Sequence, residues 1–244
     1  MWQRIAAHHD IQDQIAMMIP LKDEHPSGSI PVLVIGILLA NVGIFVYAWL
    51  LGDIGFHVFT ARYGTIPFEI MQGTDAISPT PIPLYLTVLS SMFMHGGILH
   101  LGGNMLYLWI FGNNIEAALG RVRFLFFYLF CGIIATLSHV ISEPESTIPM
   151  VGASGAIAGI LGGYLAAFPG TRILVLVFYF ILRVPALIVL GGWFVIQLLN
   201  ASSASGTSDV AWFAHIAGFV VGYVLMRQWK NKIPAKRVYE QWEY

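Results

Sequence analysis

The sequence predicts an all-α membrane protein built as a bundle of six membrane-spanning helices. Its 244 residues are 57% hydrophobic and only 10% charged, and the mean hydropathy is +0.73. A soluble domain of this length could not bury so much apolar surface. The apolar residues also gather into runs separated by polar loops, which is the pattern of a polytopic membrane protein.

Charge and cysteine content exclude several classes of function. The net charge is −1, and no basic cluster precedes the C-terminus, so we expect no nucleic-acid partner. The single cysteine, Cys131, lies inside an apolar run and supports neither a disulfide framework nor a thiolate metal site. We expect no metal and no cofactor.

Residues 1–29 form a polar N-terminal segment that precedes the first span. The segment carries four acidic residues and lacks the features of a secretory signal or a transit peptide, so we expect it to remain in the cytosol. Its scattered apolar residues would allow a short amphipathic helix at the membrane surface. Residues 30–51 contain no charge and are long enough to cross ~30 Å of hydrocarbon.

The connection from residue 52 to about residue 97 is long and contains four prolines. Its later part, residues 84–94, is apolar but too short to span the membrane. We predict a partly submerged external loop, because irregular backbone is tolerated at membrane depth where protein or a wet cavity covers it.

Five further spans are expected in the membrane domain, which we assign to residues 30–228. The fourth span is short, rich in Gly and Ala, and stopped by Pro169-Gly170. The chain from 173 to 199 is apolar apart from Arg183, and its length favours one span after Pro185. The other three are expected at 98 to beyond 111, at 124–141 and at 210–226, before a basic cytosolic tail at 229–244.

The distribution of basic residues supports this layout. With both termini in the cytosol, all twelve Lys and Arg except Arg62 lie on the cytosolic side, as the positive-inside rule requires. Counting 84–94 as a seventh span fits the charges almost as well, but it requires a two-residue turn at Gly96-Gly97. We therefore predict six spans in a plasma or inner cell membrane.

Four polar side chains from three spans are expected at one depth below the outer surface. Ser154 and His215 lie in the first two turns of helices that run inward, and at ~1.5 Å per residue their depths nearly coincide. His100 and Asn104 begin another inward-running span and share one helical face. Polar groups inside a membrane are costly, so a functional site is the default hypothesis.

Stripes of small residues indicate that the fourth and sixth spans pack closely together, which would bring Ser154 near His215. The stripes are Gly155, Gly159 and Gly163 on one span, and Ala214, Gly218 and Gly222 on the other.

The expected chemistry is acyl transfer by a serine–histidine dyad. Neutral His215 would take the proton of Ser154, whose oxygen would attack a carbonyl carbon. Asn104, His100 and the N–H of Ser154 could stabilise the oxyanion, while Gly152 would keep the approach open for a substrate backbone. These spans contain no Asp or Glu to orient His215.

From about residue 84 to residue 222 the sequence resembles the rhomboid intramembrane serine proteases. The resemblance implies a six-helix rhomboid-like bundle, Ser154 as nucleophile, His215 as base, and His100 with Asn104 at the oxyanion. It also implies that the partners are transmembrane protein substrates, cut near the outer end of their span, and membrane lipid. The matching residues are Gly152-Ala153-Ser154-Gly155, His95 with His100 and Asn104, Gly112 with Glu116, Gly120 and Phe124, and His215 with Gly218 and Gly222.

The sequence departs from the family pattern at two points. The long external connection has no Trp-Arg pair, and Ala158 stands where some members carry an aromatic ring that stacks on the histidine. His95 and His139 are expected to be structural, and Glu116 is expected to stabilise the cytosolic loop after the second span. The Ser/Gly-rich loop 201–209 is a candidate lid.

Two alternatives remain open at this point. The first is a catalytically silent rhomboid-like protein that binds membrane helices as a chaperone or trafficking factor. The second is a transporter or a haem carrier that uses His100, His139 and His215.

Overall fold

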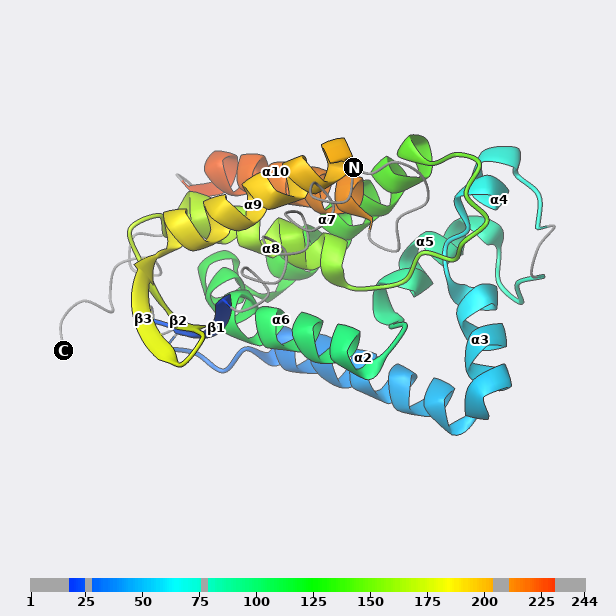
Figure 1. The fold of residues 1–244 in the computed structure, drawn as a ribbon, viewed down its shortest axis with the longest axis horizontal. Coiled ribbons are helices and arrows are strands. Elements are labelled where there is room, and N and C mark those ends of the chain that lie inside the picture. Colours follow the sequence, from blue (N-terminus) through cyan, green and yellow to red (C-terminus); the bar gives the residue numbers. More distant parts are fainter. Residues whose placement is uncertain (1–17, 25–27, 76–78, 204–210, 231–244) are drawn as a thin grey trace, which may run out of the picture.

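The computed structural model describes residues 18–24, 28–75, 79–203 and 211–230. Within this part of the chain, long helices form a bundle, with a small sheet at one end and two shorter helices, α3 and α4, at the other (Figure 1). The expected helix at the N-terminus, most of the candidate lid and the tail from residue 231 lie outside the described residues.

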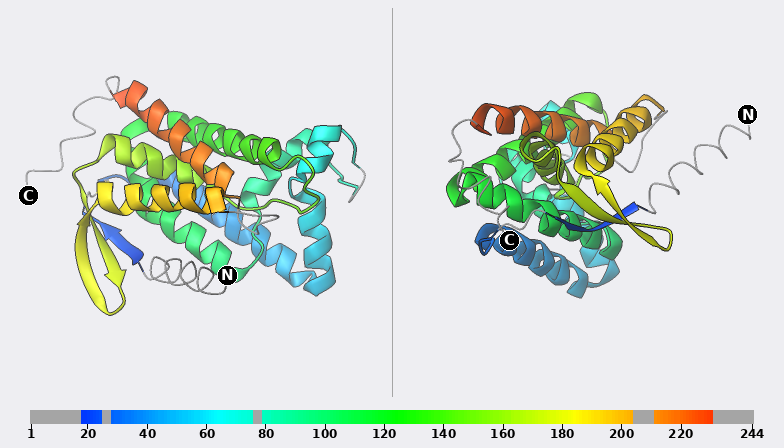
Figure 2. Two further views of the ribbon diagram at one scale, coloured as in Figure 1. Left: turned by 45° about the horizontal axis from the view of Figure 1, so that its top comes forward. Right: turned by 90° about the vertical axis from the view of Figure 1, so that its left-hand side faces the viewer.

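The long helices occur where the sequence predicts spans. α8 contacts α6, α7, α9 and α10, and Figure 2 shows it running between α9 and α10. Every residue of α8 after Ser154 is buried. The long helices are α2 (Val32–Leu50), α6 (Ile98–Leu119), α7 (Arg121–Ser142), α8 (Ser154–Ala167), α9 (Ala186–Ser203) and α10 (Trp212–Lys230).

By length and composition alone, fewer of these helices than the six expected could cross a membrane. Among the described residues, α2 and α7 are long and apolar enough to cross a membrane. A third crossing is reached if Leu84–Phe93 and α6, which meet at a bend of 79°, count as one broken span. α8 and α9 are shorter apolar helices. The number of six crossings therefore stays a prediction.

The described fold is mostly helical, as expected, but it is not purely helical, because it also contains a three-stranded antiparallel sheet in the order β1-β2-β3. Its strands are β1 (Met18–Asp23), β2 (Arg172–Val177) and β3 (Phe180–Pro185). The run 172–185 is rich in Ile, Val, Leu and Phe, which suit a pleated surface, and β2 buries Ile173 and Val175. The apolar run 173–199 is longer than one span needs, and its first part forms the hairpin of β2 and β3.

The connection between α2 and α6 is also more regular than expected. It contains α3 (Gly52–Tyr63), α4 (Pro67–Gln72), α5 (Thr87–Ser90) and the 3-10 turns η1 (Leu84–Leu86) and η2 (Ser91–Phe93). Thr65 and Met150 exchange backbone hydrogen bonds of 3.0 and 2.8 Å. This region therefore supports the loop that leads into α8.

Two buried carboxylates tie the end of the bundle that carries the sheet. Glu116 on α6 accepts hydrogen bonds from the N–H groups of Leu33 (3.0 Å) and Val34 (2.9 Å) at the start of α2. It thus connects the beginning of α2 to α6, and a negative charge at this position complements the helix dipole. Asp23 on β1 accepts hydrogen bonds from Asn114 on α6 and from the hydroxyl of Tyr164 on α8. Part of the segment 1–29 is therefore integrated into the fold.

The burial of Asp23 leads to a pH-dependent stability. Loss of water around the carboxylate raises the pKa of Asp23 from 3.8 to about 6. Because the pKa in the folded protein is the higher one, folding takes up a proton between these values. The contribution of Asp23 to stability is therefore greatest below pH 3.8 and is lost as the pH rises through about 6.

We expect Asp23→Asn to stabilise the folded protein by about 1–3 kcal/mol above pH 7, because the amide accepts a hydrogen bond without a buried charge. The gain should disappear towards pH 4. Thermal unfolding of the two proteins in detergent at several pH values measures it, with Asp53→Asn at an exposed position as the control. A gain that grew as the pH fell would contradict this account.

Candidate active site

The loop before α8 places Ser154 at the first residue of a helix. Gly152 has a φ of 135°, a conformation that other residues rarely adopt. A Cβ at this position would also lie 2.9 Å from Nε2 of His100. The N–H of Gly152 donates to the carbonyl of Ser91 at 2.9 Å. The N–H of Gly152 is therefore already engaged and is not free to bind a ligand. What the position requires is the conformation and the small size of glycine.

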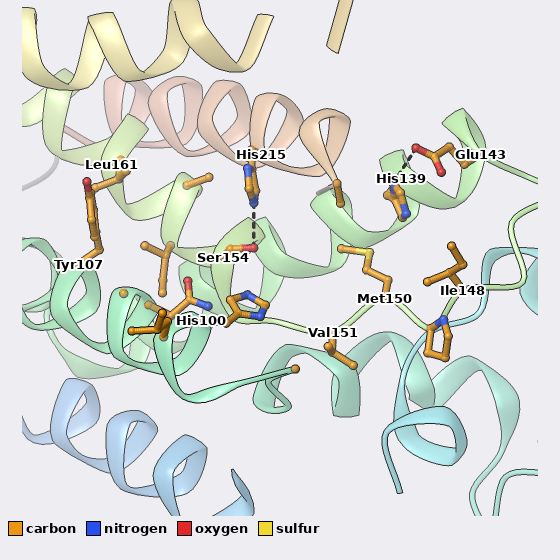
Figure 3. Close-up of a pocket in the computed structure, with 18 of the residues that line it drawn as sticks. His100, Tyr107, His139, Glu143, Ile148, Met150, Val151, Ser154, Leu161 and His215 are labelled. Atoms are coloured by element: carbon orange, nitrogen blue, oxygen red, sulfur yellow. Dashed lines mark hydrogen bonds and ion pairs between the residues drawn. The ribbon is translucent and has the colours of Figure 1, made fainter. Parts of the chain in front are cut away.

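The structure brings Ser154 and His215 into direct contact. Oγ of Ser154 lies 2.8 Å from Nε2 of His215 (Figure 3). The contact bridges the first turns of α8 and α10, 61 residues apart in the sequence. The side chains are thus positioned for transfer of the hydroxyl proton to the ring.

Glycines on α8 and α10 allow the two helices to approach closely enough for this contact. A Cβ on Gly218 would collide with the carbonyl oxygen of Gly155, and a Cβ on Gly222 would collide with that of Gly159. Both obstacles are backbone atoms and cannot rotate away. The small-residue stripes therefore hold α8 and α10 at a separation that only glycine permits.

Three residues that sequence reasoning missed surround the ring of His215. Nδ1 lies 2.8 Å from Oε1 of Gln197 on α9. The rings of Trp193 and Trp212 lie at centroid distances of 5.9 and 6.3 Å from the imidazole. Trp193 thus supplies from α9 an aromatic contact where Ala158 provides none. Gln197, a polar residue inside an apolar run, was a visible signal.

His100 and Asn104 line the same cavity as the serine and the histidine. The cavity has a volume of ≈ 530 Å³, and Figure 3 shows His100 across Ser154 from His215. The Nδ2 atom of Asn104 is buried and has no hydrogen-bond partner in the part of the chain that the structure describes. An unpaired buried donor is costly, and this one is available to a ligand in the cavity.

The other histidines occupy different positions. His95 is buried, its ring lies edge-on to His100 at 5.1 Å, and neither nitrogen has a partner among the described residues. His139 lines the cavity and lies 3.9 Å from Glu143. Both ring nitrogens of His215 are engaged, on Ser154 and on Gln197. The arrangement therefore leaves neither nitrogen free to ligate a haem iron.

Residues 84–229 match the family model of the rhomboid domain. The chain belongs to the rhomboid family. It is therefore a multi-pass membrane protein. The matched region begins in the connection before α6 and includes all of the candidate active site.

Several curated rhomboid proteins are similar in sequence. Rhomboid protein 1, mitochondrial, of Saccharomyces cerevisiae is 31% identical over 145 residues, which are 56% of this chain and 40% of that protein. Rhomboid protease GluP of Bacillus subtilis is 32% identical over 136 residues, 56% of this chain and 24% of the relative. Putative rhomboid protease YdcA of the same organism is 37% identical over 78 residues, 32% of this chain and 39% of the relative.

The chain covers less than half the length of each of these relatives. Some rhomboid relatives are named as proteases, which supports the serine protease class. Others are named as mitochondrial. The expected location in a plasma membrane stays a prediction.

Proposed function

We propose that this protein is an intramembrane serine endopeptidase that cuts transmembrane proteins near the outer end of their span. The observation that carries the proposal is the 2.8 Å contact between Ser154 and His215 inside a cavity that also holds an unpaired amide of Asn104. This arrangement supports the proposal, because acyl transfer needs a nucleophile, a base and an oxyanion donor in one place.

In the acylation step, Nε2 of His215 takes the hydroxyl proton while Oγ of Ser154 attacks the carbonyl carbon of the substrate. The carbonyl oxygen becomes negative and accepts hydrogen bonds from Asn104, His100 and the N–H of Ser154. The first N–H groups of a helix have no intrahelical partner, so this last donor is available. His215 then gives its proton to the leaving nitrogen, and the C–N bond breaks.

Deacylation repeats the same steps with water as the nucleophile. Water gives a proton to His215 and attacks the acyl carbon, and the proton returns to Oγ as the ester bond breaks. The cavity lining includes His139, Glu143 and Ser146, whose polar groups favour water. With both termini in the cytosol of a plasma membrane, the cavity would open to the outer side.

The test is cleavage of a reporter transmembrane protein by the purified protein in proteoliposomes, with the cut bond located by mass spectrometry. We expect a cut near the outer end of the reporter span. Asn104→Leu should lower kcat by about 10²–10³-fold with little change in KM, because it removes a donor used mainly in the transition state. Binding of the reporter without any cut by the wild type would instead support a silent helix-binding protein.

A further inference from the structure

Gln197 is a polar residue inside the apolar part of α9, which extends from Ala186 to Leu199. Its side chain is 5% exposed, while its neighbours Val195 and Leu198 are 51% and 43% exposed. Trp193, one turn earlier, lies on the same helical face and also contacts His215. α9 therefore directs its buried face towards the histidine of the proposed dyad.

The chemistry of the amide decides which nitrogen of His215 carries the proton. Oε1 of a glutamine can only accept a hydrogen bond, so the 2.8 Å contact requires a proton on Nδ1. A neutral imidazole with this proton has its lone pair on Nε2. That nitrogen faces the hydroxyl of Ser154 at 2.8 Å.

We propose that Gln197 is a positioning residue that holds His215 in the tautomer and orientation needed to accept the proton of Ser154. This inference rests on the proposed protease function and adds a third member to the dyad. Without Gln197, the ring can place its proton on Nε2 and point it at Oγ. The serine would then have no base.

The surroundings explain why an amide suits this role. A carboxylate at this depth would be a buried charge next to apolar side chains, which is costly without a fixed positive partner. A neutral carbonyl oxygen fixes the tautomer without that cost. α8, α9 and α10 contain no Asp or Glu, and Gln197 supplies an acceptor for His215.

The first test measures the tautomer directly in the wild-type protein. Histidine labelled with ¹⁵N distinguishes a protonated ring nitrogen from an unprotonated one by its chemical shift, and the spectrum of His215→Ala identifies the signals of His215. We expect the proton on Nδ1 at neutral pH. A proton on Nε2 would overturn the proposal, whether or not the protein cleaves a substrate.

The second test separates positioning from a structural role. Gln197→Met keeps the length of the side chain but removes the acceptor, and we expect kcat to fall about 10–100-fold with KM and the unfolding temperature nearly unchanged. Gln197→Glu keeps an acceptor oxygen, so its kcat should exceed that of Gln197→Met, while its buried carboxylate should lower the unfolding temperature. Leu198→Met, at an exposed position of the same helix, serves as the matched control.

Combining Gln197→Met with His215→Ala should cause no loss beyond that of His215→Ala alone, because Gln197 acts only through the ring. Wild-type cleavage together with full activity of Gln197→Met would overturn the positioning role and leave the proposed function standing. No cleavage by the wild type would instead count against the proposed function, while the tautomer measurement still tests Gln197.

Discussion

Ser154→Ala should lower kcat for cleavage of a transmembrane reporter by at least about 10⁴-fold, because no other atom takes the place of the nucleophile. Oγ is the atom that contacts Nε2 of His215, and the substitution removes little besides that oxygen. Folding should be unaffected, because Ser154 is the first residue of α8 and not its N-cap. The N-cap is Ala153, and it makes no side-chain cap hydrogen bond. Quantified product formation measures the effect.

His215→Ala should cause a loss of similar size, and the double variant should be no worse than either single one. Such non-additivity is expected of two groups that act as a unit. Asp53→Asn, at an exposed position of the connection before α6, is the control and should retain full activity. Undiminished cleavage by either single variant would remove the dyad.

Gly222→Ala should both destabilise the protein and reduce cleavage by the molecules that remain folded. The added Cβ would collide with the carbonyl oxygen and Cα of Gly159, so α8 and α10 must separate. Overpacking of this kind costs about 1–3 kcal/mol. Separation of the helices would also lengthen the contact between Ser154 and His215, which proton transfer does not tolerate.

The matched control is Gly36→Ala on α2, where a Cβ has no atom within 4 Å. There the substitution should stabilise the helix slightly, because alanine favours a helix over glycine by about 1 kcal/mol. Unfolding temperature and kcat of both variants provide the comparison. A Gly222→Ala protein with wild-type stability and activity would show that the close approach of α8 and α10 is dispensable.

The sequence predicted the long helices well because uninterrupted apolar runs leave few alternatives. The sheet could not be predicted in the same way. A run such as 172–185 is apolar on both faces, and periodicity then cannot distinguish a strand from a buried helix. Its partner β1 comes from residues 18–23, so the pairing depends on a contact between distant segments.

The candidate site followed from depth, since a rise of ~1.5 Å per residue places the beginnings of inward-running helices at one level. Ser154, His215, His100 and Asn104 are accordingly found around one cavity. Depth says nothing about how a helix is rotated. The sequence therefore shows Gln197 as a polar residue in an apolar run, but it does not show that this face of α9 is turned towards His215.

The complete burial of α8 beyond Ser154 bears on the selectivity of any hydrolase that works inside a bilayer. The phospholipids around it are esters, and their carbonyl groups far outnumber those of any protein substrate. A reactive hydroxyl on a peripheral helix would meet these esters continually. Here the serine begins the helix that α6, α7, α9 and α10 contact, and it lines the cavity. If the protein is the proposed hydrolase, this placement would keep the surrounding lipid from becoming a competing substrate.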